Sequence, residues 1–370
     1  MKEKTEKGIT LIALVVTIVI LLILSGVTIN MLLGEDGIIR TAQEAKNTWE
    51  GAIANEQKEI QNLVNELNNI MNGEGGQPGT DPEEPEEPEP IPADGSFSEE
   101  KGGNTPNLHG GTLTPVKWKD NGDGSYTMVE TTADDPEWYS YTTTDKKWAN
   151  AITEDGSMWV WIPRYAYQIA DNYHTNSSTG GTINIKFMKE TTNEAADGTT
   201  TWQNASGQGN WNIHPGFEYS STAPGLWVAK FKASQSDAGA NAADYQNYTG
   251  GTSGVIKIQP GVNSWRNINI GDIYTKCLNY DSNTLENANL NSHLMKNTEW
   301  GAVVYLAQSS YGKNAEVWIN PNSNYLTGQA GTGPRVGSTT STSTYNTGNG
   351  PQASTTGNVY GVYDMSRRSI

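Results

Sequence analysis

The most pronounced pattern in the sequence is a run of 25 uncharged, mostly apolar residues at positions 9–33, which follows a short charged and polar leader. As a helix rising about 1.5 Å per residue, this run would be about 38 Å long. That length is sufficient to cross a hydrocarbon core of about 30 Å with some tilt. No small-residue cleavage site follows the run, as would be expected after a secretory signal peptide. The pattern therefore predicts a retained membrane-spanning helix over residues 9–34.

Basic residues before this span predict its orientation. Lys2, Lys4 and Lys7 precede the apolar run, and acidic residues contribute little to the positive-inside rule. We therefore expect a single-pass protein of the cell membrane with its N-terminus in the cytoplasm. The C-terminal domain would then be extracellular.

Apolar residues continue beyond the span at steps of three and four, from Ile38 to Ile70. This spacing predicts an amphipathic helical stem over residues 35–72. Its apolar stripe would pack against identical helices, as in a filament or coiled coil, or would cover the base of the outer domain. The sequence leaves both arrangements open.

A spacer separates this stem from the rest of the chain. Residues 73–92 contain seven acidic residues, no basic residue and many prolines. Proline favours an extended path and like charges repel one another, so an acidic, semi-rigid linker is predicted over residues 73–94.

The remaining residues, 95–370, alternate short β-prone runs with turn signals. Strands are predicted over residues 116–119 and 125–130, paired as a hairpin, and over residues 158–162, 182–187, 225–231 and 255–258. Three-and-four spacing predicts one helix over residues 291–306. The Gly-, Ser- and Thr-rich stretch 328–357 is expected to form surface loops. The predicted fold class is therefore α+β, with a β-rich outer domain.

Charge and cysteine content restrict the possible partners. The chain carries 41 acidic and 24 basic residues, for a net charge of −17, which opposes binding to nucleic acid. The single cysteine, Cys277, cannot form a disulfide within the chain. We expect it to be a small buried apolar residue rather than a reactive thiol.

The residues Lys7-Gly8-Ile9-Thr10-Leu11-Ile12-Ala13 resemble the start of a type IV prepilin, as found in pilins and pseudopilins. The resemblance implies that residues 1–8 are a leader, which a prepilin peptidase removes between Gly8 and Ile9, and that the new N-terminus is methylated. Ile9 stands where the family usually has Phe, and Ala13 where it usually has Glu. Such a Glu could neutralise a neighbouring subunit's terminal amine, so assembly with pilin-like subunits is left open. The alternative is an uncleaved single-pass anchor.

Several stretches of the outer region resemble the formylglycine-generating-enzyme type of C-type-lectin-like domain, which variable binding proteins of diversity-generating retroelements also use. They are residues 158–163, 214–217, 225–231, 294–302 and 357–366. The resemblance implies a mixed α+β domain with long irregular loops. The family continues with a further strand where this chain reads Arg367-Arg368-Ser369-Ile370. One expectation is therefore a truncation relative to the family, and the other is a natural end whose open sheet edge a partner covers.

Catalysis is not predicted. The formylglycine-generating enzymes use a pair of copper-binding cysteines, whereas this chain has only Cys277. The four histidines have no metal-ligand spacing. No catalytic residue, metal or cofactor is therefore expected, and an enzyme of the formylglycine-generating type is the less favoured hypothesis.

Aromatic residues provide the candidate binding surface. Twelve Trp and 17 Tyr accompany only four Phe, and indole rings suit both sugar faces and protein interfaces. We expect Trp159, Trp161 and Trp227 to be core residues because they lie in predicted strands, and Trp202 and Trp211 to be the better surface candidates. The resulting hypothesis is a cell-surface, pilin-like protein that displays a lectin-like domain for an extracellular carbohydrate or protein ligand.

Overall fold

The computed structural model describes residues 94–176, 180–218, 223–239, 254–266, 268–285, 290–317, 326–331 and 342–366. The predicted leader with Gly8 and Ile9, the membrane-spanning helix, the stem and nearly all of the linker lie outside the described residues. Within the described part of the chain, no helix is long and apolar enough to cross a bilayer.

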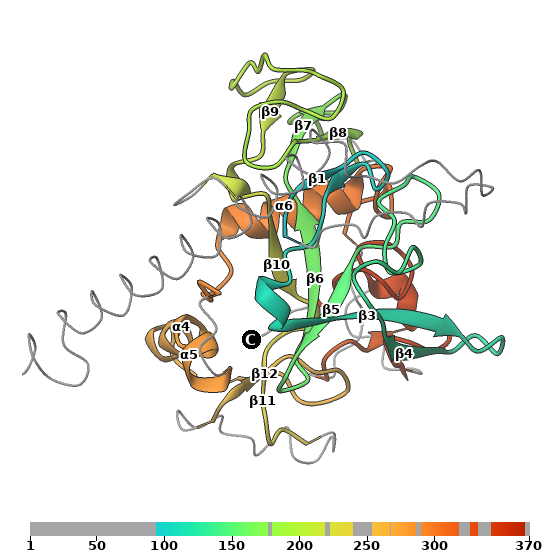
Figure 1. Ribbon diagram of the computed structural model, residues 1–370, viewed down its shortest axis with the longest axis vertical. Helices are drawn as coiled ribbons and strands as arrows, with labels where there is room; N and C mark the ends of the chain where they lie inside the picture. Colours follow the sequence, from blue (N-terminus) through green and yellow to red (C-terminus); the bar gives the residue numbers. More distant parts are fainter. Residues whose placement is uncertain are drawn as a thin grey trace, which may run out of the picture. The chain divides into compact units, whose positions relative to one another are not determined.

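A five-stranded antiparallel sheet in the order β10-β6-β5-β3-β4 lies at the centre of the described domain (Figure 1). Its strands are β3 (Leu113–Asp120), β4 (Tyr126–Glu130), β5 (Asn150–Thr153), β6 (Met158–Pro163) and β10 (Gly225–Ala229). The predicted hairpin is confirmed as β3 and β4. Strands β6 and β10 were also predicted, and they pair with Trp161 opposite Trp227.

A second antiparallel sheet has three strands in the order β8-β7-β9. These are β7 (Tyr165–Ile169), β8 (Ile183–Phe187) and β9 (Trp211–Ile213). Short ribbons join β1 (Phe97–Ser98) to β2 (Gly103–Asn104), β11 (Ser234–Gln235) to β12 (Ile256–Lys257), and β13 (Ala330–Gly331) to β14 (Thr342–Ser343). The predicted strands over 182–187 and 255–258 correspond to β8 and β12. The β-rich character predicted for residues 95–370 is thus confirmed for the described residues.

Three α-helices accompany the sheets in the described residues: α4 (Ile270–Leu278), α5 (Tyr280–Thr284) and α6 (Asn297–Gln308). The predicted helix over 291–306 is confirmed as α6 but begins six residues later. Lys296 has an extended backbone, and its N–H donates to the Glu299 carboxylate at 2.8 Å. This cap ends the extended segment and starts the helix.

The hydrophobic core has two main clusters. One groups buried aromatic residues, among them Trp138, Trp148 and Trp161, with Val303 and Leu306 of α6. The other gathers Trp118, Phe231, Trp265, Val359 and Tyr363, among others. Bulky aromatic side chains therefore supply much of the buried apolar area that a domain without disulfides requires.

The prediction that residues 328–357 form surface loops is wrong for much of the described part of that stretch. Ala330 and Pro351 are buried, and the Tyr345 ring packs 5.1 Å from that of Phe231. A Cβ on Gly350 would lie 1.7 Å from the Thr344 carbonyl oxygen. The small residues of this stretch therefore permit close backbone packing rather than solvent exposure.

Candidate functional site

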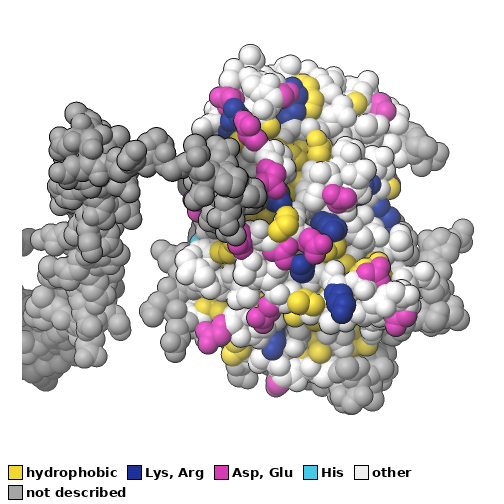
Figure 2. Space-filling model, turned by 45° about the vertical axis from the view of Figure 1, so that its right-hand side comes forward, with side chains coloured by type: hydrophobic (Ala, Val, Ile, Leu, Met, Phe, Trp, Pro, Cys, Tyr) yellow, Lys and Arg dark blue, Asp and Glu magenta, His cyan; other side chains and the backbone are white. Residues whose placement is uncertain are grey.

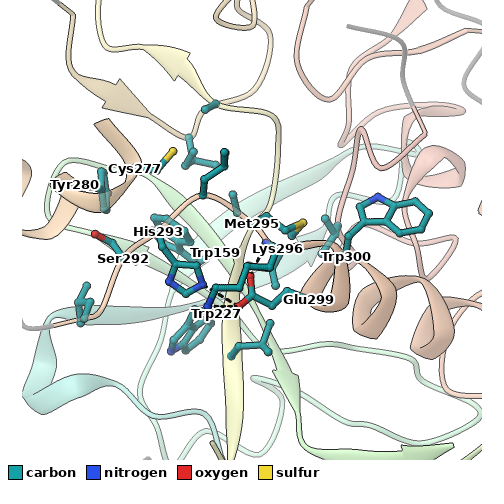
Figure 3. A pocket seen from close by; sticks show the side chains of 18 of the residues that line it. Trp159, Trp227, Cys277, Tyr280, Ser292, His293, Met295, Lys296, Glu299 and Trp300 are labelled. Atoms are coloured by element: carbon teal, nitrogen blue, oxygen red, sulfur yellow. Dashed lines mark hydrogen bonds and ion pairs between the residues drawn. The ribbon is translucent and has the colours of Figure 1, made fainter. Parts of the chain in front are cut away.

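A cavity of about 760 Å³ lies beside β10. Its wall is formed by all of β10, by parts of β6, α4 and α6, and by the extended residues 290–296 (Figure 3). The described end of the chain, including Asp364 and Met365, also contributes to the lining. This volume is typical of small-ligand pockets.

Five tryptophans line the cavity, of which Trp161 and Trp265 are buried and the other three are partly exposed. Hydrogen bonds hold the polar edge of each of these three indoles. Nε1 of Trp227 donates to the Asn107 carbonyl at 2.7 Å, and Nε1 of Trp300 to the Met365 carbonyl at 3.3 Å. Nε1 of Trp159 lies 3.2 Å from the Thr153 hydroxyl. Because these contacts occupy the indole N–H groups, the apolar parts of the rings remain for contact with a ligand.

The placement of these tryptophans corrects part of the sequence interpretation. Trp161 is a core residue with 2% of its surface exposed, as predicted. Trp159 and Trp227 pack against the core clusters but are only half-buried and also line the cavity, so the prediction that they are core residues is only partly correct. Trp227 lies on β10, which ends the sheet in the described residues, and Trp159 lies opposite the small Ala229 of the same strand, so neither ring is fully covered.

A charged cluster closes one part of the cavity. His293 Nε2 lies 2.8 Å from Glu299 Oε1, and Lys296 Nζ lies 3.4 Å from the same oxygen. His293 Nδ1 lies 2.7 Å from the Asn291 carbonyl oxygen. Both ring nitrogens thus face oxygen acceptors, an arrangement that suits the doubly protonated imidazolium.

The titration of the cluster follows from these contacts. The hydrogen bond to Glu299 raises the pKa of His293 above its usual 6.5, although partial burial opposes the effect. Burial by itself would raise the pKa of Glu299, but the hydrogen bonds from His293 and from the Lys296 N–H, with the two nearby positive charges, lower it below 4.5. The hydrogen bond between the two side chains thus favours the charged form of each.

Cys277 lies on α4 and contributes to the cavity wall. Burial raises the pKa of its thiol to about 11, so the thiol is protonated near neutral pH and is a weak nucleophile. Cys277 was predicted to be a small buried apolar residue rather than a reactive thiol; it is partly buried, and its protonated thiol agrees with low reactivity.

The other histidines are placed separately. His214 is buried, accepts a hydrogen bond from the Gly216 N–H at 3.1 Å, and has its pKa lowered by burial to about 3. His109 borders the cavity, whereas the His174 ring stacks on Tyr173. In the part of the chain that the structure describes, no three His, Cys, Asp or Glu side chains form a group that could hold a metal ion.

The predicted surface candidates Trp202 and Trp211 are not among the described residues that line the cavity. Both are half-buried and pack against a small cluster of Ala166, Met188 and Ala195. Nε1 of Trp202 donates to the Asn193 carbonyl at 3.0 Å. They form a second, separate aromatic surface.

The charge distribution on the described domain is mixed. Figure 2 shows Lys and Arg side chains interspersed with Asp and Glu on one face, without a large area of a single sign. Part of the net negative charge belongs to the linker, whose residues 73–92 hold seven acids. On this face, the binding chemistry of the domain is therefore local rather than a general electrostatic attraction.

Comparisons of the chain with known protein families, with curated proteins and with solved structures found no match.

Proposed function

We propose that the protein is a cell-surface, pilin-like protein whose outer domain is a non-catalytic, lectin-like binding module. In this proposal, the N-terminal segment anchors the chain in the membrane, the acidic linker holds the domain away from it, and the cavity beside β10 binds an extracellular carbohydrate or protein ligand.

The observation that supports this role best is the composition of the cavity. Trp159, Trp227 and Trp300 contribute apolar ring surface, and the hydrogen-bonded His293–Glu299 pair contributes polar atoms held in fixed positions. Ligand pockets combine largely apolar walls with a few fixed polar groups in this way. Aromatic side chains that are part-exposed and held by hydrogen bonds also lose little conformational entropy when they bind.

The non-catalytic part of the proposal depends on the reactivity of the lining residues. The Cys277 thiol is protonated near neutral pH, and Glu299 is already engaged by His293 and Lys296. Neither group is prepared for nucleophilic or general-base chemistry. A protein that only binds needs no such group.

The binding role can be tested with the full chain applied to arrays of immobilised glycans and extracellular proteins. We expect Trp300→Ala to weaken any specific binding at least tenfold, because the ring is 41% exposed and lines the cavity. Trp202→Ala and Trp211→Ala should leave this binding unchanged. Binding that survives Trp300→Ala but fails in the other two variants would move the site to the second aromatic surface.

The pilin-like role requires a separate measurement. Expression with a prepilin peptidase should give a mature chain that starts at a methylated Ile9, as mass spectrometry would detect. A chain that keeps Met1 would favour the uncleaved, membrane-anchored adhesin instead. An intact product found only in the soluble cytosol would contradict both forms of the proposal.

A further inference from the structure

Strand β10 is an edge strand. In the described residues it pairs only with β6, at the end of the five-stranded sheet. Its other edge meets the cavity, since all five of its residues contribute to the lining. Figure 1 shows β10 beside β6, with α4 and α5 lying apart from its outer edge.

The hydrogen-bond register identifies the backbone groups that face this open edge. The Lys230 N–H donates to the Met158 carbonyl at 2.9 Å, and the Arg164 N–H to the Pro224 carbonyl at 2.8 Å. Because bonded pairs alternate in an antiparallel ladder, Leu226 and Val228 direct their backbone groups to β6. Gly225, Trp227 and Ala229 therefore direct theirs away from it.

The opposite side of β6 gives the same alternation. The Trp161 N–H donates to the Ala149 carbonyl at 2.9 Å, so Trp159 and Trp161 face β5. The even-numbered residues of β6 then face β10. The outward direction of Gly225, Trp227 and Ala229 thus follows from two independent sets of contacts.

These outward groups are unused within the described part of the chain. No hydrogen bond between described residues involves the backbone N–H or C=O of Gly225, Trp227 or Ala229. Burying such groups without a partner is unfavourable, so a ligand that fills the cavity along β10 must satisfy them. The partner groups have to repeat every second residue, which is the spacing of another strand.

The surroundings of the edge are suited to a single strand. The open edge spans five residues, or roughly 17 Å at about 3.3 Å per residue. The extended residues 290–296 form another wall of the cavity, and Figure 3 shows His293 and Trp227 both at this site. Apolar side chains flank the backbone edge, so a peptide with apolar residues at alternate positions would be complementary to it.

We infer that the open edge of β10 is a docking site for an extended peptide segment of a partner protein, which adds to the five-stranded sheet as a further strand. This inference depends on the proposed role of the cavity as a ligand site and specifies the class of ligand. Main-chain hydrogen bonds from Gly225, Trp227 and Ala229 supply the register, and the cavity tryptophans contact alternate side chains. If the cavity bound a carbohydrate instead, or if β10 paired with a second copy of this chain, this inference would be wrong.

The test uses seven-residue linear peptides selected from a random displayed library on the detergent-solubilised full chain. The tightest-binding peptide is then synthesised as two isomers, one with backbone N-methyl groups on its odd-numbered residues and one with them on its even-numbered residues. Only one of the two sets can face β10, so one isomer should lose binding at least tenfold and the other should keep it. Equal binding of both isomers, or failure to select any peptide, would overturn the inference.

A matched pair of proline variants provides the second measurement. Ala229→Pro removes an N–H that faces the open edge and leaves the hydrogen bonds to β6 in place. Met128→Pro makes the same change on β4, the opposite edge of the sheet, where the Asn121 N–H bond to the Ser125 carbonyl sets an outward position for Met128. Ala229→Pro should weaken the selected peptide at least tenfold and Met128→Pro should not.

The outcomes separate this inference from the proposed function. Equal peptide affinity in both folded proline variants would reject strand addition. If Trp300→Ala still abolished binding on the arrays, the cavity would remain a ligand site that works through side chains alone. If Trp300→Ala also left binding on the arrays unchanged, both the strand-addition inference and the proposed ligand role of the cavity would be rejected.

Discussion

The Lys230 ammonium donates a hydrogen bond of 2.7 Å to the Asn150 Oδ1, and both side chains are fully buried. The same ammonium donates to the carbonyls of Val359 and Gly361 at 2.8 and 2.9 Å. Asn150 in turn donates to the Tyr360 carbonyl at 2.8 Å. The hydrogen bonds of this pair therefore hold residues 359–361 against the central sheet. The next residues, 362–365, line the cavity.

Replacing this lysine should destabilise the whole domain. Lys230→Met preserves much of the side-chain volume but leaves Asn150 and two carbonyls without their buried donor, at an expected loss of about 3 kcal/mol in the free energy of unfolding. Urea denaturation would measure it. Lys119→Met, at an exposed position of β3, controls for the loss of positive charge and should change stability by less than about 0.5 kcal/mol. Similar stabilities for the two variants would contradict the structural role of Lys230.

The His293–Glu299 pair should stabilise the domain within a limited pH range. The raised pKa of His293 means that its contribution is complete below about pH 6.5 and is lost as pH rises through the folded pKa. The lowered pKa of Glu299 means that its contribution is present above about pH 4.5 and is lost as pH falls through the folded value. The two effects overlap between these limits.

We therefore expect Glu299→Gln to reduce stability most between pH 4.5 and 6.5, by about 1 kcal/mol, with a smaller difference on either side. Urea unfolding of the wild type and the variant across this range would show it. Glu130→Gln, at an exposed position of β4, serves as the control for the loss of one carboxylate. A wild-type advantage that grew steadily above pH 8 would have the wrong sign for this pair.

The Cys277 thiol should react slowly in the folded protein. A pKa of about 11 instead of 9.0 leaves about a hundredth of the ordinary thiolate, so alkylation by iodoacetamide at pH 8 should be about 100-fold slower than in the urea-unfolded chain. Mass spectrometry would follow the reaction, and the unfolded chain is the internal control. Native and unfolded rates within a factor of three would show that the thiol is not protected.

The strands found from sequence are those with strong local signals. The runs that became β6, β8 and β10 are rich in Trp, Val, Ile and Phe and are bounded by turn residues. Strand β7 was missed because only Arg164 separates it from β6, so that the two read as one run. Helix α4 was missed although its apolar residues recur at steps of three and four, because it has only nine residues and includes Gly271, which disfavours a helix.

The cavity could not be predicted because it depends on which strand ends the sheet. The sequence around Trp227 would look the same in a central strand as in an edge strand. Only the order of the strands in the sheet shows that Trp227 lies at an edge. His293 and Glu299 are close in sequence, but they meet because the helix starts at Asn297 instead of Asn291. Trp300 then reaches the same cavity from the first turn of that helix.

Gly225 should be the residue of β10 least tolerant of substitution. A Cβ at this position would lie 2.3 Å from the Trp161 ring and 2.7 Å from the Ile162 carbonyl oxygen. Because backbone and a buried indole cannot easily move aside, Gly225→Ala should destabilise the domain by about 2 kcal/mol. It should also disturb the start of the β6–β10 pairing, and with it the shape of the cavity. Thermal and urea unfolding of the two proteins would measure the effect on stability.

Gly271→Ala provides the matched control, since its nearest contact would be 3.4 Å away and the position lies in the first turn of α4. There the substitution should leave stability unchanged or raise it by up to about 1 kcal/mol, so equal losses at both glycines would contradict the close packing of β10 on Trp161.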